Sequence, residues 1–362
     1  MENKPTIHVI IPVYKAEKYI ARTLDSVLSQ PYPNIEIVCV DDGSPDNSIS
    51  ILRNYESQYE NVHVIRQENA GVSAARNTGI EYVLGGGTDG YLTFLDADDL
   101  WARDVIAEEE VAAWYEDCVS YTSVRCSEDM KYTMPVDTIH TDGTICGGAN
   151  NVWFANSNNH HLGAAFYSCK LLQNYHLRFV QGLNYAEDLL FKFSCYYLAE
   201  HIGLHHKISY LYRMNPVGAM SRRKYGIEFL TPIIHSYLKA YDYLRQYEND
   251  VRGTAKFCKV LAGVHMMDMA QEHFQKFQNK QKWERFIEEN PDLQKIVIDL
   301  EPKDLADIHK QMRNLYLYQF GKFVLYNRIT GIKLWIRTVL KSNSLAQSYY
   351  TQKIYNEKNQ YL

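Results

Sequence analysis

The sequence lacks the cysteine patterns that hold small secreted domains or zinc modules together. Its 362 residues include seven cysteines, and no two of them form a C-x-x-C pair. An odd number of scattered cysteines indicates neither a disulfide framework nor a zinc knuckle. The chain is long enough to bury a substantial hydrophobic core, so we expect packing rather than cross-links to hold the fold.

Long hydrophobic runs are also missing. No stretch approaches the roughly 18–20 continuous apolar residues that span a bilayer, and the apolar run at Ile7–Ile11 is too short for a signal peptide. We therefore expect a cytoplasmic protein, with association at the inner face of the cell membrane as an open possibility.

There is no overall excess of positive charge, since the net charge is -5. We therefore expect no nucleic-acid partner. The charge is unevenly distributed, because the segment from His309 to the end contains nine lysines and arginines but only one acidic residue. Such asymmetry predicts that the tail and the body contact different partners.

Residues 331–341 within this basic tail have the pattern of an amphipathic helix. Apolar residues recur at helical spacing beside a basic stripe formed by Lys333, Arg337 and Lys341. Two interpretations remain open. The helix binds an anionic membrane surface, or it docks on the acidic body of the same chain.

The first hundred residues alternate between strand and helix patterns. Strands are predicted over 7–11, 35–40, 62–66 and 91–95, and helices over 16–29, about 46–59 and 73–84. Asp46 or Ser44 is expected to cap the second helix. This order predicts an α/β fold, with a Rossmann-like, mostly parallel sheet flanked by helices on both faces.

Three polar clusters follow predicted strands. They are Pro12-Val13-Tyr14 after the first strand, Asp41-Asp42-Gly43-Ser44 after the second, and Asp96-Ala97-Asp98-Asp99 after the fourth. Ligands of such sheets bind beyond the carboxyl ends of the strands. The clusters therefore predict one site at that edge.

Three carboxylates within four residues at a strand end repel one another, and a hard divalent cation would relieve that repulsion. Asp96 and Asp98 can share one side only if the extended geometry continues past the strand. The alternative is a solvated acidic loop that caps the next helix. Elsewhere, Asp42 could accept the imide N–H of a uracil ring or simply shape a turn. Arg76 could reach a phosphate or the acidic cluster, or face solvent.

Four motifs resemble those of the family 2 glycosyltransferases of the GT-A fold. They are Ile10–Tyr14 (IIPVY), Val40–Ser44 (VDDGS), Asn69–Asn77 (NAGVSAARN) and Phe94–Asp99 (FLDADD), in this order and spacing. The resemblance covers the first hundred residues closely and continues loosely to about residue 222. It implies an inverting transferase that usually takes a UDP-sugar, less often a GDP- or dTDP-sugar.

The resemblance also implies roles for individual residues. Pro12, Val13 and Tyr14 would line the base and ribose pocket, Asp42 would bind the uracil edge, and Asn69 and Arg76 would complete the nucleotide site. Asp96 would meet the ribose or a metal-bound water, and Ala97 would belong to the same nucleotide-binding segment. Asp98 would be the metal ligand, holding Mn²⁺ or Mg²⁺ against the diphosphate.

Family members carry a downstream Glu-Asp pair whose second residue is the catalytic base. Glu187-Asp188 matches it, which implies that Asp188 is the base. Many relatives have a histidine shortly after the position of Tyr212-Arg213, and Asn215 departs from that pattern.

We therefore expect residues 1–222 to form the catalytic GT-A domain and residues 223–362 a C-terminal helical region. The acceptor implied by the resemblance is a hydroxyl of a growing polysaccharide or a lipid-linked glycan. Two other classes remain open, a nucleotidyltransferase and a non-catalytic subunit that binds nucleotide sugars or acts as a scaffold.

Overall fold

Four parallel strands form the first half of the fold, as the sequence predicts. They are β1 (Ile7–Val13), β2 (Ile35–Asp42), β3 (Val62–Gln67) and β4 (Tyr91–Phe94), side by side in the order β3-β2-β1-β4. The computed structural model describes residues 4–214, apart from 88, 109–110, 112–113, 115, 128, 130–132, 138–141, 147–160 and 184–186.

Helices connect these strands close to the predicted positions: α1 (Ile20–Leu28), α2 (Ser48–Gln58) and α3 (Val72–Gly85). α1 begins four residues later than predicted, because the carbonyl of Ala16 accepts from the amides of Tyr19 and Ile20 and closes a turn first. The predicted cap of α2 is displaced as well. Asn47 occupies the cap position, while Asp46 accepts a hydrogen bond from the amide of Ser48.

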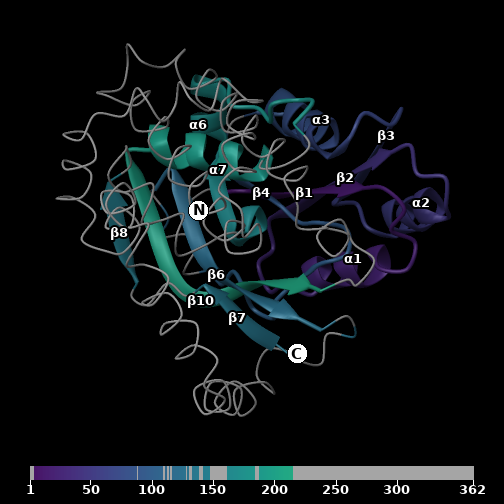
Figure 1. Cartoon of the computed structure of the whole chain (residues 1–362), viewed down its shortest axis with the longest axis horizontal. Coiled ribbons are helices and arrows are strands. Elements are labelled where there is room, and N and C mark those ends of the chain that lie inside the picture. Colours follow the sequence, from purple (N-terminus) through teal and green to yellow (C-terminus); the bar gives the residue numbers. More distant parts are fainter. Residues whose placement is uncertain are drawn as a thin grey trace, which may run out of the picture. The chain divides into compact units, whose positions relative to one another are not determined.

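Alternate residues of the strands point to opposite faces of the sheet. The odd-numbered residues of β1, from Ile7 to Val13, join one buried cluster with Leu24 of α1 and Leu52 of α2. Ile10 faces the other side, where Gly79 of α3 lies against it. Figure 1 shows α1 and α3 on opposite sides of these strands, which agrees with the predicted layering.

The second half of the fold extends the same sheet in mixed directions, giving the order β3-β2-β1-β4-β9-β6-β10-β5, with β7 and β8 attached at β6 and β10. Its elements are β5 (Leu100–Trp101), β6 (Cys118–Cys126), β7 (Thr133–Asp137), β8 (Gly143–Cys146), the 3₁₀ turn η1 (Leu162–Ala164), β9 (Ala165–Ser168), α6 (Cys169–Asn174), α7 (Glu187–Leu198) and β10 (His201–Arg213).

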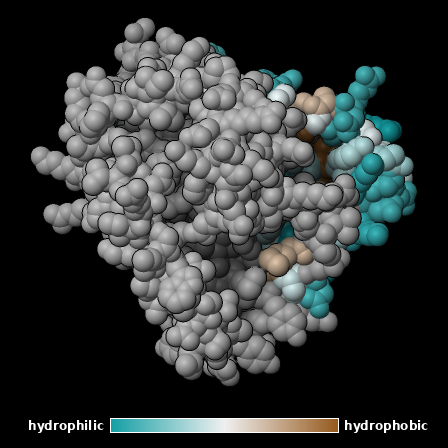
Figure 2. All heavy atoms as spheres, in the orientation of Figure 1, coloured by the Kyte–Doolittle hydropathy of each residue, from teal (hydrophilic) through white to brown (hydrophobic). Residues whose placement is uncertain are grey.

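All described residues belong to one compact unit. In the view of Figure 2 the coloured, described part of its surface is mostly hydrophilic. Among the helices that the structure describes, none combines the length and the apolar character needed to cross a bilayer. The predicted C-terminal helical region and the basic segment 331–341 lie outside the described residues.

The close approach of α3 to β1 gives a test of the fold. A Cβ added to Gly79 would overlap the side chain of Ile10, so we expect Gly79→Ala to lower the free energy of unfolding by about 1–3 kcal/mol. Gly85 in the same helix faces open space, and Gly85→Ala should be neutral or stabilising by up to about 1 kcal/mol. Urea unfolding measures both, and equal effects would contradict the packing described.

Candidate active site at the carboxyl edge of the sheet

The ends of the four parallel strands meet at one edge of the sheet. Val13 is in register with Asp41, and Asp42 with Gln67. Just beyond β4, the amide of Leu95 donates to the carbonyl of Ile10 at 3.0 Å. The three polar clusters that the sequence singled out therefore lie on neighbouring strands at the predicted edge.

The loop after β1 is tied to the loop after β2. The amide of Lys15 donates to the hydroxyl of Ser44 (3.2 Å), and the amide of Ala16 donates to the hydroxyl of Ser48 (2.9 Å). Of the predicted base-pocket residues, Tyr14 has an exposed side chain (47%), whereas the side chain of Val13 is buried in the core. Val13 can therefore offer a ligand its backbone, and Tyr14 can offer a ring.

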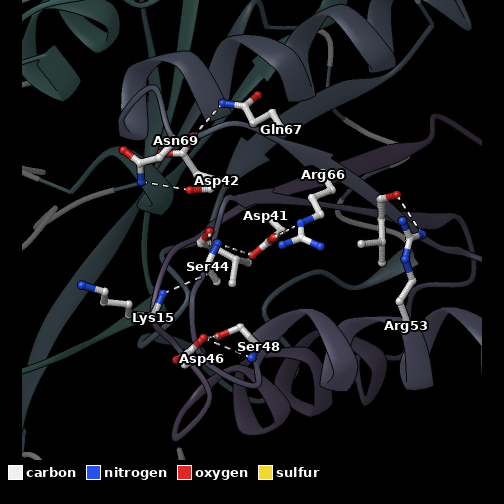
Figure 3. A network of polar contacts seen from close by, with 12 residues as sticks. Lys15, Asp41, Asp42, Ser44, Asp46, Ser48, Arg53, Arg66, Gln67 and Asn69 are labelled. Carbon is white, nitrogen blue, oxygen red and sulfur yellow. Dashed lines mark hydrogen bonds and ion pairs between the residues drawn. The ribbon is translucent and has the colours of Figure 1, made fainter.

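Asp42 organises the loop between β3 and α3 (Figure 3). Its carboxylate accepts hydrogen bonds from the side chain of Gln67 (2.8 Å) and from the amides of Ala70 and Gly71 (both 2.9 Å). The side chain of Asn69 donates to the backbone carbonyl of Asp42 (2.9 Å). A carboxylate offers about four acceptor positions. Asp42 therefore shapes the neighbouring loop and keeps about one acceptor position for a ligand.

The other member of the pair, Asp41, is fully buried and has a different set of contacts. One oxygen accepts from the amide of Ser44 (3.3 Å), and the other lies 3.4 Å from the guanidinium of Arg66. Gly43, between Asp42 and Ser44, has a φ of +68°, which favours glycine. An added Cβ there would come 3.0 Å from the amide nitrogen of Asn69. The turn thus needs glycine for two reasons.

Arg76 connects the loop after β4 with the start of α7, which lies far away in the sequence. Its guanidinium donates to the carboxylate of Asp96 at 2.9 Å and to that of Glu187 at 3.2 Å. Only 5% of Arg76 is exposed, so the solvent-facing interpretation is wrong and the contact with the acidic cluster is confirmed. α3 begins at the loop that Asp42 organises, so one helix joins both parts of the edge.

The contacts between Arg76 and its carboxylate neighbours shift the pKa values of both Arg76 and Glu187. Burial lowers the pKa of Arg76, but the carboxylates of Asp96, Glu187 and Asp188 outweigh burial and raise the pKa above its ordinary value. Burial and the neighbouring Asp188 raise the pKa of Glu187, an effect that Arg76 partly offsets. The guanidinium therefore stays charged and makes two closely placed carboxylates tolerable.

The segment Asp96–Asp99 forms a turn. β4 ends at Phe94, and the amide of Asp99 donates to the carbonyl of Asp96 at 2.9 Å. The extended geometry of β4 therefore does not continue to Asp98, and strand alternation does not put Asp96 and Asp98 on the same side. The hydroxyl of Thr23 in α1 stabilises the turn, because it lies 2.9 Å from the carbonyl oxygens of both Ala97 and Asp99.

Asp99 differs from its neighbours because it is fully buried. Its carboxylate accepts from the hydroxyl of Tyr210 (2.6 Å) and from the amide of Arg213 (2.7 Å). Burial raises its pKa well above the ordinary value, and the charges of Asp96 and Asp98 add to this. Asp99 thus supports the turn from inside, whereas Asp96 and Asp98 are partly exposed.

Several residues that shape this edge were not predicted as site residues: Thr23, Gln67, Tyr210 and Arg213. Thr23 sits among the apolar positions of its helix, and its polarity at a buried position is a signal that sequence reasoning could have used. Tyr210 has no local signal, because its partner Asp99 lies more than a hundred residues away.

The donor set suits a hard cation. Mg²⁺ and Mn²⁺ take oxygen ligands, typically one or two carboxylates plus substrate phosphates. Asp96 and Asp98 are both partly exposed, although one oxygen of Asp96 already accepts from Arg76. Within the described residues, no group of three or more histidine, cysteine, aspartate or glutamate side chains is arranged so that it could hold a metal ion by itself. A cation here would therefore need phosphate oxygens to complete its shell.

The bridge formed by Arg76 gives a test. Arg76→Gln leaves Glu187 buried without its cation, so we expect a loss of about 2–4 kcal/mol in the free energy of unfolding at pH 8. A carboxyl with a raised folded pKa takes up a proton as the pH falls, so the loss should shrink towards pH 5.

Arg178→Gln is the matched control, because it breaks a more exposed pair with Glu81 and should cost under about 1 kcal/mol. Denaturant unfolding at the two pH values measures both variants. A loss from Arg76→Gln that matches the control, or that grows at low pH, would contradict the bridge.

Comparison with known proteins agrees with this geometry. Residues 8–175 match the family model "Glycosyl transferase family 2". The glycosyltransferase EpsJ of Bacillus subtilis is 30% identical over 224 residues, which cover 59% of this chain and 62% of EpsJ. The glycosyltransferase GlyA of Streptococcus pneumoniae is 44% identical over 115 residues, covering 32% of this chain and 15% of GlyA. The chain thus spans less than two thirds of these relatives.

Among solved structures, residues 1–349 of TarS from S. aureus in complex with UDP-GlcNAc superpose with a TM-score of 0.64 at 20% identity. The match covers 88% of each chain, and it shows the shared fold, GT-A. The predicted fold class is therefore confirmed. With its motifs at the predicted strand ends, residues 8–175 of this chain form a domain of the glycosyl transferase family 2 type.

Proposed function

We propose that this protein transfers a sugar, with inversion, from a nucleotide diphosphate donor to an acceptor hydroxyl. The proposed donor is a UDP-sugar. The observation that carries the proposal is the bridge from Arg76 to Asp96 and Glu187. It brings the proposed donor loop and the start of α7, where Asp188 lies, to the same edge of the sheet.

In the proposed reaction Asp188 is the general base. Its carboxylate takes the proton of the acceptor hydroxyl, the acceptor oxygen forms a bond to the anomeric carbon, and the bond from that carbon to the phosphate oxygen breaks. The electron pair leaves with the nucleoside diphosphate. A positioned base of this kind contributes about 10²–10⁴ to the rate. Attack opposite to the leaving group inverts the anomeric configuration.

Asp98 is the proposed metal ligand, with Mn²⁺ or Mg²⁺ as the ion, and Asp96 would meet the ribose or a metal-bound water. When bound, such an ion neutralises charge that develops on the diphosphate. Arg76 keeps Asp96 in place for this role and adds positive charge near the phosphates. Just before α3 begins, Asp42 and Asn69 would receive the base, with Pro12, Val13 and Tyr14 beside it.

The proposed donor class is supported by a structural relative. TarS was solved with UDP-GlcNAc, which favours a UDP-sugar here. The proposed acceptor is a hydroxyl of a growing polysaccharide or a lipid-linked glycan. We also retain the proposal of a catalytic domain at residues 1–222 followed by a C-terminal region at 223–362.

The alternatives differ from this proposal in measurable ways. A non-catalytic subunit would bind nucleotide sugars without turnover, and a nucleotidyltransferase would act on a nucleoside triphosphate. Slow metal-dependent hydrolysis of a UDP-sugar in the absence of acceptor would support the transferase and contradict both alternatives.

The role of Asp188 is tested by Asp188→Asn. We expect sugar transfer to fall at least about 10²-fold, because the amide cannot take the proton, while the affinity for UDP in the presence of Mn²⁺ stays within about twofold. Asp25→Asn, at an exposed position of α1, is the control and should leave both quantities unchanged. Near-normal transfer by Asp188→Asn would remove Asp188 from the mechanism.

The basic segment 331–341 supplies a separate test. If it binds an anionic membrane surface, the full chain should co-sediment with phosphatidylglycerol vesicles, and replacing Lys333, Arg337 and Lys341 by Glu should abolish this. If the segment docks on the acidic body instead, the wild-type chain should stay in the supernatant at physiological salt.

A further inference from the structure

The turn Asp96–Asp99 connects β4 to β5, and these two strands pair with different parts of the sheet. On one side β4 pairs with β1. On the other side β5 pairs with β10, where Leu100 is in register with Leu211 and Trp101 with Tyr210. The position of the proposed metal ligand therefore depends on how β10 is placed relative to β1.

One hydroxyl group connects both ends of this turn. The Tyr210 hydroxyl donates to the carboxylate of Asp99 at 2.6 Å and accepts from the amide of Asp96 at 3.4 Å. Asp98 lies between these two contacts along the chain. The guanidinium of Arg213 adds a third, because its Nε donates to the carbonyl of Asp98 at 2.6 Å.

The ring of Tyr210 is itself firmly held. It is 2% exposed and stacks on His161, with the ring centroids 5.5 Å apart and the planes within 16°. The backbone at Gly163 presses against the ring, so that an added Cβ would overlap both the ring and the carbonyl of Phe94. A side chain packed in this way can hold its hydroxyl at a fixed point.

We propose that Tyr210 is a positioning residue for the donor-bound cation, acting through Asp99 and the backbone of the turn to set the place of Asp98. This inference rests on the proposed function, since it assumes that Asp98 binds Mn²⁺ or Mg²⁺ together with a nucleoside diphosphate. Outer partners that orient a metal ligand typically contribute 10–100-fold to metal affinity. Tyr210 differs from such partners in acting through the backbone of the turn.

The test compares Tyr210→Phe with Tyr196→Phe in the full-length protein. Each variant loses one buried hydroxyl, since Tyr196 donates to Ser120 at 2.8 Å within the core. UDP binding is measured by calorimetry over a series of Mn²⁺ concentrations, and free Mn²⁺ by electron paramagnetic resonance. Neither readout depends on activity.

We expect Tyr210→Phe to raise the half-saturating Mn²⁺ concentration about tenfold or more, and Tyr196→Phe to leave it unchanged, with comparable melting temperatures for the two. An unchanged Mn²⁺ requirement in Tyr210→Phe, or equal changes in both variants, would overturn the inference. A wild-type protein that fails to bind UDP at any Mn²⁺ concentration would contradict the proposed function itself.

Asp99→Asn gives a second test, because it changes the partner of the Tyr210 hydroxyl and leaves Tyr210 itself intact. If Tyr210 acts through Asp99, the two substitutions should be non-additive, so that the double variant needs no more Mn²⁺ than the worse single variant. Additive effects of the two substitutions on the Mn²⁺ requirement would contradict a role exerted through Asp99.

Discussion

The contact on which the site depends is the ion bridge from the buried guanidinium of Arg76 to the partly exposed carboxylates of Asp96 and Glu187. Carboxylates gathered at one edge of a sheet repel each other, and burial strengthens that repulsion. A guanidinium can satisfy two of them at once because its donors are fixed in a planar fork. The bridge brings together the loop that follows β4 and the first turn of α7, although Asp96 and Glu187 lie far apart in the sequence.

The parallel strands explain why such a bridge can form. Their carboxyl ends meet at one edge, so each loop adds its polar residues to a common region. α3 then links two of these loops. It begins at the loop that Asp42 shapes and carries Arg76 to the acidic turn, so the proposed base-binding part and the proposed phosphate-binding part share one rigid element.

Much of this could be predicted from the sequence, because the relevant signals are local. Apolar runs that end in proline, glycine or paired aspartates gave the four strands and the edge at which they meet. Three things were not predictable in this way. Strand alternation at Asp96 and Asp98 fails because β4 ends at Phe94 and a turn takes over. The burial of Asp99 depends on Tyr210 and Arg213, which a distant strand supplies. The carboxylate of Asp42 accepts three hydrogen bonds from Gln67, Ala70 and Gly71, and the sequence does not reveal that most of its acceptor positions are used in this way.

The central claim is that the acidic turn, the bridge and the start of α7 form one donor site. A crystal structure of the protein with UDP and Mn²⁺, with data collected at the manganese edge, tests this most directly. The account predicts an anomalous peak between the carboxylate of Asp98 and the diphosphate, with Arg76 still bound to Asp96 and Glu187. A peak away from Asp98, or a nucleotide bound away from the carboxyl edge of β1 and β4, would contradict it.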